Sequence, residues 1–476
     1  MNKVKLLPIG SSLIPLIILI ILLAYNVFVF EEDALSGSNQ FILLIGAAVA
    51  AIIGFYYKIS YKNMLVKVAD NFQSVAGAIL ILLFVGALAG TWLASGIIPA
   101  MIYYGLKILH PSIFLPSCII ICAIISLATG SSWTTSATVG IALIGIGKAL
   151  GLPPGMIAGA VISGAYFGDK LSPLSDTTNL APAMSGGDLF THIKYMTLTT
   201  VPSIIITILV FVMLGFFQEQ KGNADILTLL NQIELKFKIN YWLFIVPAFV
   251  VFLISRKTPP LIALFSGTIL GAVFALIFQP DIILELSGEK IYNFSSAYRG
   301  VLNAITIGSQ IETDNKLLYD LFSSGGMKGM LDTIWLIICA MVFGGIMEAI
   351  GALSSITNTL LSWAKNTFQL FASTVATCLT INLTASDQYL AIVIPGRMFS
   401  KAYQDRNLAP ENLSRTLEDS GTVTSALIPW NTCGAYQASV LNVSVADYFI
   451  YAVFNWISPF ITLLYVAFKI KIRSLK

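Results

Sequence analysis

Apolar runs of near-spanning length recur along the whole chain, and they restrict its fold more than any other feature. The first two cover residues 11–30 and 41–57, and about 20 apolar residues in a helix cross the hydrocarbon core of a bilayer. Further runs lie near residues 75–93, 97–109, 112–127, 195–217, 241–254, 261–278, 331–350, 371–381, 389–399 and 448–470. Hydrophobic residues make up 57% of the chain and charged residues only 11%. The sequence therefore predicts an all-α polytopic membrane protein.

Charged residues between the runs predict which side each loop faces. Basic residues are Lys3 and Lys5 at the start, Lys58, Lys62 and Lys67 after the second run, Arg256 and Lys257 in a later hairpin, and Lys469, Lys471, Arg473 and Lys476 in the tail. Glu31, Glu32 and Asp33 follow the first run. By the positive-inside rule both termini are cytoplasmic and the number of crossings is even. The polar stretch 279–328 is predicted to be an extramembrane connector between two halves of the chain.

Two polar tracts, 130–135 and 168–179, interrupt the apolar pattern of the first half. They contain two carboxylates, Asp169 and Asp176, and the hydroxyls of Ser131, Ser132, Thr134, Ser172, Ser175 and Thr177. Irregular backbone at membrane depth persists only where it is buried in protein or lines a cavity. Carboxylates, hydroxyls and freed carbonyls together suit a hard cation. These tracts therefore predict an ion-binding site.

The second half has matching interruptions at residues 382–388 and 418–434. They contribute Asp387, Thr422, Asn431 and Thr432 to the predicted site. An offset of 256 places Pro154 on Pro410, Pro173 on Pro429 and Ser175 on Asn431, which indicates an internal repeat. Residues 397–415 carry four basic residues, whereas the corresponding link in the first half has essentially Lys148 alone. We therefore expect the two units to be inverted, with the second link cytoplasmic.

Several of these residues have structural alternatives. Asp169 could pair with its neighbour Lys170, and Asp176 could cap the helix that follows it. Glu418 and Asp419 are expected to be solvated or paired with Arg415. His192 is expected at a membrane interface. The five cysteines show no metal or disulfide spacing and are interpreted as small core residues.

The tract 164–181, with 130–135 before it, resembles the NhaC family of bacterial sodium/proton antiporters, a family that also includes malate/sodium-lactate antiporters. The stretches 324–330 and 386–389 extend the resemblance over most of the chain. It implies two inverted-topology repeats, each with a re-entrant hairpin and a broken transmembrane helix. It also implies a homodimer with separate scaffold and transport parts. We accordingly expect scaffold helices in 1–110, a first transport repeat in 111–217, scaffold helices and connector in 218–330, and a second repeat with the C-terminal helix in 331–476.

The predicted function is exchange of Na⁺ for H⁺ by alternating access in a bacterial inner membrane. Na⁺ and H⁺ would bind in turn at one or two of the carboxylates Asp169, Asp176 and Asp387, because burial disfavours a bare carboxylate and either cation neutralises it. The alternative is a sodium- or proton-coupled carrier of small carboxylates, such as malate and lactate. An enzyme is not expected, because the sequence has no HExxH or paired catalytic Asp motif. We expect no cofactor and no nucleic-acid partner.

Overall fold

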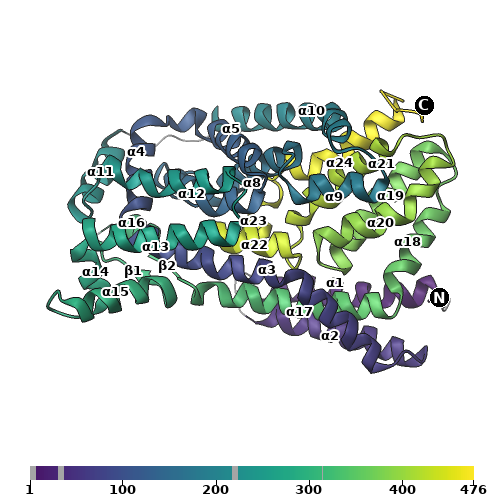
Figure 1. Ribbon diagram of the computed structural model, residues 1–476, viewed down its shortest axis with the longest axis horizontal. Coiled ribbons are helices and arrows are strands. Elements are labelled where there is room, and N and C mark those ends of the chain that lie inside the picture. The colour runs from purple at the N-terminus through teal and green to yellow at the C-terminus, as the bar shows by residue number, and fades with distance from the viewer. Residues whose placement is uncertain (1–6, 31–36, 217–222, 314, 476) are drawn as a thin grey trace.

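The structure is a computed structural model that describes residues 7–30, 37–216, 223–313 and 315–475. Nearly all of this chain is helical, and most helices run along the long axis of the molecule (Figure 1). Among the described residues, seven segments are long and apolar enough to cross a membrane: Ile9–Phe30, Ser38–Tyr56, Tyr61–Ala94, Pro111–Thr129, Leu189–Phe216, Pro260–Phe278 and Lys328–Ala349. A bent pair, Ile226–Lys236 with Tyr241–Ser255, makes an eighth candidate. The prediction of an all-α polytopic membrane protein is confirmed.

The elements follow one another in this order. The first half contains α1 (Ile9–Phe30), α2 (Ser38–Tyr56), α3 (Tyr61–Ala94), α4 (Ile97–Ile108), α5 (Pro111–Thr129), α6 (Ser132–Thr135), the π-helical turn η2 (Ser136–Gly140), α7 (Ile141–Ala149), α8 (Pro154–Leu171), α9 (Asp176–Ser185) and α10 (Leu189–Phe216). Then come α11 (Asn223–Lys236), η3 (Tyr241–Phe244), α12 (Ile245–Ser255), α13 (Pro260–Phe278), α14 (Pro280–Ser287), α15 (Phe294–Thr306), β1 (Ser309–Gln310), α16 (Lys316–Leu321), β2 (Ser323–Ser324) and η4 (Lys328–Met330). The rest is α17 (Leu331–Ala349), α18 (Ala352–Ser362), α19 (Thr367–Thr384), α20 (Gln388–Gln404), α21 (Pro410–Leu417), the π-helical turn η5 (Glu418–Thr422), the 3₁₀ turn η6 (Val423–Leu427), α22 (Thr432–Leu441), α23 (Val445–Phe449) and α24 (Val453–Ala467).

Three expected boundaries differ in the structure. α3 begins at Tyr61, so Lys62 and Lys67 lie on its first turns and not in a loop. The polar stretch 218–240 contains α11, whose Leu229, Leu230 and Ile233 are buried. The last apolar run is divided into α23 and α24, with Ile450, Tyr451 and Ala452 between the two helices. Charges at Lys3, Lys5, Glu31, Glu32, Asp33 and Lys476 lie outside the described residues.

The helices pack into two groups. In one, α3 lies against α13 and α17, and α17 also packs on α2 (Figure 1). In the other, α5 packs along α8, and α8 also contacts α10, α23 and α24. The α5–α8 contact is close because Gly164 and Gly168 face the α5 backbone, where added Cβ atoms would lie 2.3 Å from the carbonyl oxygens of Ile119 and Ala123. Small residues four apart permit such close helix packing in membranes.

Equivalent helix breaks occur in the two halves. α5 ends at Gly130 and α19 is followed by Ser386, and both residues have positive φ angles, 71° and 58°. The next residues, Ser131 and Asp387, each cap a helix. Pro154 and Pro410 each begin a helix, and Ser175 and Asn431 each cap the helix after the next break. Every pair is 256 residues apart in the chain. The offset predicted from the prolines therefore matches the positions of the caps and breaks.

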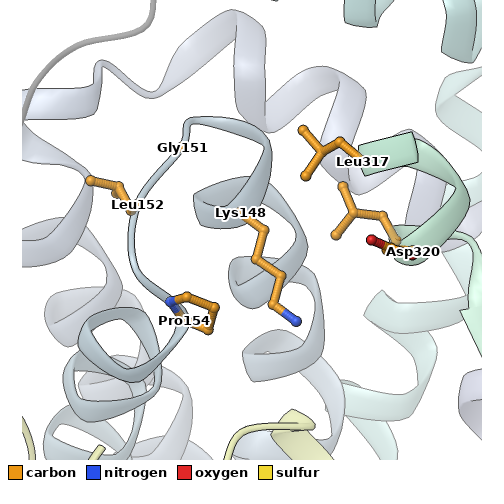
Figure 2. A pocket seen from close by; sticks show the side chains of 7 residues that line it. Lys148, Gly151, Leu152, Pro154, Leu317 and Asp320 are labelled. Carbon is orange, nitrogen blue, oxygen red and sulfur yellow. The ribbon is translucent and has the colours of Figure 1, made fainter. Parts of the chain in front are cut away.

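Each half has a link between two helices: residues 150–153 join α7 to α8 in the first half, and residues 405–409 join α20 to α21 in the second. These two links lie at opposite ends of the molecule. The second link bonds the C-terminal tail: the Ala409 N–H donates to the Arg473 carbonyl at 3.0 Å, and Leu408 bridges to Ser474. The first link lies against connector helix α16 around a pocket of about 500 Å³, where Figure 2 shows Lys148 extending beside Pro154 and facing Leu317 and Asp320. In Figure 1 the connector elements occupy the left end, and both chain ends lie at the right.

Candidate functional site

A cavity of about 560 Å³ lies where the helix breaks of the two halves meet. It is lined by α3, by the breaks after α5 and α8, by the turn between α12 and α13, and by the starts of α20 and α22. The predicted residues in its wall are Ser131, Ser132, Thr134, Asp169, Ser175, Asp176, Thr177, Asp387 and Thr432. Polar side chains from four helix starts therefore face one space.

The first wall is formed by the break between α5 and α6. Gly130 closes α5 in the left-handed conformation, and a Cβ there would lie 2.6 Å from the Cβ of Leu174, so glycine lets the two breaks of this half touch. The Ser131 hydroxyl oxygen then accepts from the Thr134 N–H at 3.1 Å and from its hydroxyl at 3.0 Å. This cap satisfies backbone donors that the break leaves free.

Asp169 joins this break to the last turn of α8. Its Oδ2 accepts from the Ser132 N–H at 3.0 Å and from the Ser132 hydroxyl at 2.7 Å. Only 8% of the residue is exposed. The alternative in which Asp169 pairs with Lys170 is wrong, because the ammonium of Lys170 points to Asp419 instead. Asp169 therefore keeps a carboxylate oxygen at the cavity with no basic side chain bonded to it among the described residues.

The break between α8 and α9 places Asp176 differently. Ser175 caps α9, with its oxygen accepting from the Thr178 N–H at 3.4 Å, so the alternative of Asp176 as the cap is wrong. Asp176 occupies the first turn, where its carboxylate is exposed and lines the cavity. Ser172 lies outside the cavity wall: it is buried in the break, and its hydroxyl accepts from the Leu174 N–H at 3.3 Å.

In the second half, Asp387 caps α20. Its Oδ1 accepts from the Leu390 N–H at 2.9 Å, and the residue is 2% exposed while it lines the cavity. Asn431 caps α22 through the Cys433 N–H at 3.0 Å and also donates to Asn382, so it supports the break behind the cavity wall. Thr422 lies deeper, in η5, and is also outside the wall.

A further expectation is wrong. Glu418 and Asp419 are neither solvated nor paired with Arg415: both are fully buried, and Asp419 forms an ion pair with Lys170 of α8. His192, expected at a membrane interface, is buried within the protein on α10 and shares a 2.7 Å hydrogen bond with Ser414. The five cysteines are buried and free, as expected.

Residues 164–470 match the Na⁺/H⁺ antiporter family. The chain is 35% identical to the Na⁺/H⁺ antiporter NhaC of Alkalihalophilus pseudofirmus, over 96% of this chain and 95% of that protein. This chain belongs to the Na⁺/H⁺ antiporter family. It is also 36% identical to the malate-2H⁺/Na⁺-lactate antiporter of Bacillus subtilis, over 88% and 86% of the two chains. The arginine/ornithine antiporter ArcD of Halobacterium salinarum is 33% identical over 96% and 91%.

The residues that match the antiporter family, 164–470, include Asp169, Asp176 and Asp387. The helix break at Ser131 precedes them. In the described part of the chain, no three Asp, Glu, His or Cys side chains come close enough to hold one metal ion between them. The three carboxylates therefore line one cavity without converging on a single point in this conformation. Hydroxyl and backbone oxygens would have to complete the ligand set of a bound cation.

Sequence reasoning did not identify three residues of the cavity wall. Lys257, in the turn between α12 and α13, and Gln388 and Tyr389, after the Asp387 cap, all line it. Tyr389 lies within electrostatic reach of Asp169, Asp176 and Asp387. Tyr389 follows the predicted site residue Asp387 by two positions, and this proximity in the sequence could have indicated it. Lys257 had no local signal, because only tertiary packing brings its turn to the cavity.

Proposed function

We propose that this protein exchanges Na⁺ for H⁺ across a bacterial inner membrane by alternating access. The observation that carries the proposal is that Asp169, Asp176 and Asp387, from both halves of the chain, line one cavity together with hydroxyls from four helix starts. Carboxylate and hydroxyl oxygens are ligands for hard cations, and acidic groups at membrane depth commonly mark ion and proton pathways. Membership of the Na⁺/H⁺ antiporter family supports the same activity.

Competition between the two cations at the same carboxylates provides the coupling. An ionised carboxylate away from water is costly unless a cation or a proton neutralises it. Asp169 illustrates this, since its described hydrogen-bond partners are neutral: the N–H and hydroxyl of Ser132 and the hydroxyl of Ser175. A proton occupies the carboxyl when Na⁺ is absent. Arriving Na⁺ displaces it and takes hydroxyl oxygens of the cavity wall as further ligands.

The arrangement of the chain suits alternating access. The matched breaks and the links at opposite ends support two inverted repeats, each with a re-entrant hairpin and a broken helix. In this proposal both termini and the second link are cytoplasmic and the connector lies outside. The helices around α3 and α17 form the scaffold and those around α5 and α8 the transport part, and the protein functions as a homodimer.

Transport in proteoliposomes tests the proposal. Purified protein is reconstituted with an internal pH dye, and Na⁺, Li⁺ and K⁺ are added outside in turn. Because Na⁺ added outside enters in exchange for lumenal H⁺, we expect the lumen to become more alkaline, and protein-free liposomes to show no such response. No proton movement with any of the three cations would contradict the proposal.

A second candidate is a carrier of small carboxylates. The cavity, at about 560 Å³, is much larger than a sodium ion needs, and Lys257 in its wall could pair with an organic anion. The relative in Bacillus subtilis named a malate-2H⁺/Na⁺-lactate antiporter is 36% identical. Adding malate to lactate-loaded proteoliposomes separates the candidates. Proton movement that requires malate or lactate, and is lost in Lys257→Gln, would favour the carrier.

A further inference from the structure

A second cluster of charged residues lies buried behind the cavity. Lys170 follows Asp169 on α8 and forms an ion pair with Asp419 of η5, and both side chains are fully inaccessible. Asp419 Oδ2 also accepts hydrogen bonds from the hydroxyls of Thr199, at 2.8 Å, and Thr462. Asp419 is therefore well satisfied as an anion, and it connects α8 to α10, η5 and α24.

Glu418, the residue before Asp419, has no such partners. It is fully buried, and neither carboxylate oxygen has a hydrogen bond of normal geometry with the residues that the structure describes. Lys170, which acts on it electrostatically, is already bonded to Asp419. An unpaired ionised carboxylate in a protein interior costs several kcal/mol. The packing around Glu418 therefore accommodates the neutral acid better than the anion.

A row of polar groups leads from one end of the molecule to Glu418. Arg415, Glu418 and Thr422 are three and four residues apart on consecutive helical turns, so they share one face. All are buried, the Arg415 guanidinium nitrogens have no hydrogen-bond partner among the described residues, and the Thr422 hydroxyl approaches Glu418 without a hydrogen bond of normal geometry. The row begins where α21 starts at Pro410, beside the Ala409–Arg473 contact with the tail. Buried polar groups without protein partners are the places that internal water occupies.

Other ionisable groups face this row from the elements packed around it. Lys170 and Asp169 of α8 and Asp419 of η5 act on Glu418, and the Arg415 guanidinium lies 4.6 Å from the ring centre of Tyr195 on α10. The remaining neighbours are His192 of α10 beside Ser414, Cys378 of α19 beside Ser420, and Tyr403 of α20 beside Thr416. Of the acidic groups facing Glu418, Asp419 is ion-paired with Lys170 and Asp169 belongs to the cavity. Glu418 is thus the acidic group in the row that is free to exchange a proton.

We infer that Glu418 is a second proton-binding site, reached along this row from the end that holds the C-terminal tail, and that it carries one proton beyond those exchanged at the cavity. The inference rests on the proposed exchange of Na⁺ for H⁺. Lys170 and Asp169 are adjacent on α8, and the ion pair with Asp419 ties α8 to the turn that bears Glu418. The extra proton therefore moves together with Asp169 of α8. Each cycle then moves one more positive charge as H⁺ than the cavity alone would.

The ratio of protons to sodium ions tests this inference. It is measured in proteoliposomes from the Na⁺ gradient that just balances a set pH gradient, at several membrane potentials, for wild type, Glu418→Gln, Glu418→Asp and Glu348→Gln. Glu348 is a control because it pairs with Lys67 at 2.9 Å on other helices. We expect Glu418→Gln to move one proton fewer per Na⁺ and to change its response to membrane potential accordingly. Glu418→Asp and Glu348→Gln should keep the wild-type ratio.

An unchanged ratio in Glu418→Gln would overturn the inference while leaving Na⁺/H⁺ exchange intact. A wild-type protein that exchanges no protons would contradict the proposed function instead. Infrared spectroscopy gives a readout that needs no transport: with saturating Na⁺ to displace protons from the cavity carboxyls, the wild-type protein at neutral pH should show a protonated carboxyl band that Glu418→Gln lacks and Glu348→Gln keeps. If the Glu418→Gln spectrum retains the full band, Glu418 holds no proton and the inference fails.

Discussion

Asp169 is the residue whose charge the proposed exchange requires most directly. In Asp169→Asn the amide oxygen can still accept from the N–H and hydroxyl of Ser132, which lie 3.0 and 2.7 Å from Oδ2 in the wild type. The titratable charge is lost, so Na⁺-driven proton movement should fall to the level of empty liposomes. The melting temperature in detergent should stay close to that of wild type. Near-normal exchange in Asp169→Asn, and likewise in Asp176→Asn and Asp387→Asn, would rule out the carboxylate mechanism.

The Lys170–Asp419 pair makes a separate prediction about stability. Asp419→Asn leaves the ammonium of Lys170 buried without a counter-charge, and breaking a buried pair in this way typically costs about 3–5 kcal/mol. The double variant Lys170→Met with Asp419→Leu removes both charges and should lose much less. Unfolding titrations in detergent measure both values. Equal losses in the single and double variants would show that the charge pair is not what stabilises this contact.

Residues differ in how much the sequence says about them. Asp169, Asp176 and Asp387 stand out because a carboxylate inside an apolar stretch is costly and therefore informative. Glu418 and Asp419 do not stand out, because their neighbours Glu411 and Arg415 make the segment look like a solvated helix. The partner of Asp419 is Lys170, 249 positions earlier, and a contact over that separation leaves no local pattern.

Helix breaks were predictable because they depend on local chemistry. Gly130, Pro173 and Pro429 restrict or release the backbone at the breaks, and Ser and Asn caps follow them. Two boundaries were not predictable in the same way. α3 extends to Tyr61 because Ser60 caps it, although its first turns are polar. The final run divides between Phe449 and Val453, and both of its helices pack against α8, a long-range contact that leaves no pattern in the run itself.

The contact between α5 and α8 gives a prediction at the scale of helices. In Gly168→Ala the new Cβ would lie 2.3 Å from the Ala123 carbonyl oxygen, so one helix must move. We expect a loss of about 1–3 kcal/mol in the free energy of unfolding. Gly10→Ala in α1 is the matched control, since nothing lies within 4 Å of its Cβ, and it should be neutral or slightly stabilising. Equal stability of the two variants would contradict the close packing.

At the scale of the whole molecule, the proposed inversion of the two repeats determines which residues are accessible from each face of the membrane. Arg406→Cys in the second link should react with an impermeant thiol reagent only from the cytoplasmic side, and Tyr292→Cys in the connector only from outside. The five native cysteines are buried, so they give little background. Right-side-out vesicles provide the measurement, and strong external labelling at position 406 would refute the inverted arrangement.

The 256-residue offset between matched helix breaks could be predicted from the positions of the prolines, but the grouping of the helices could not. α17 begins the second half of the chain, yet it packs on α2 and α3. In the most apolar stretch of Lys328–Ala349, which contains α17, 61% of the residues are buried, compared with 39% in α2. Hydropathy alone does not distinguish a central membrane helix from a peripheral one. Long-range packing therefore decides which helices surround the cavity.

The central claim is that Na⁺ and H⁺ compete for the carboxylates of one cavity. The most direct measurement is proton release when Na⁺ is added to the purified protein in weakly buffered detergent solution. We predict that Na⁺ releases protons in a saturable way, and that the same amount of K⁺ or of choline releases fewer. Asp169→Asn, Asp176→Asn or Asp387→Asn should reduce the release, whereas Glu348→Gln should not. Saturable Na⁺ binding without any proton release would contradict the account.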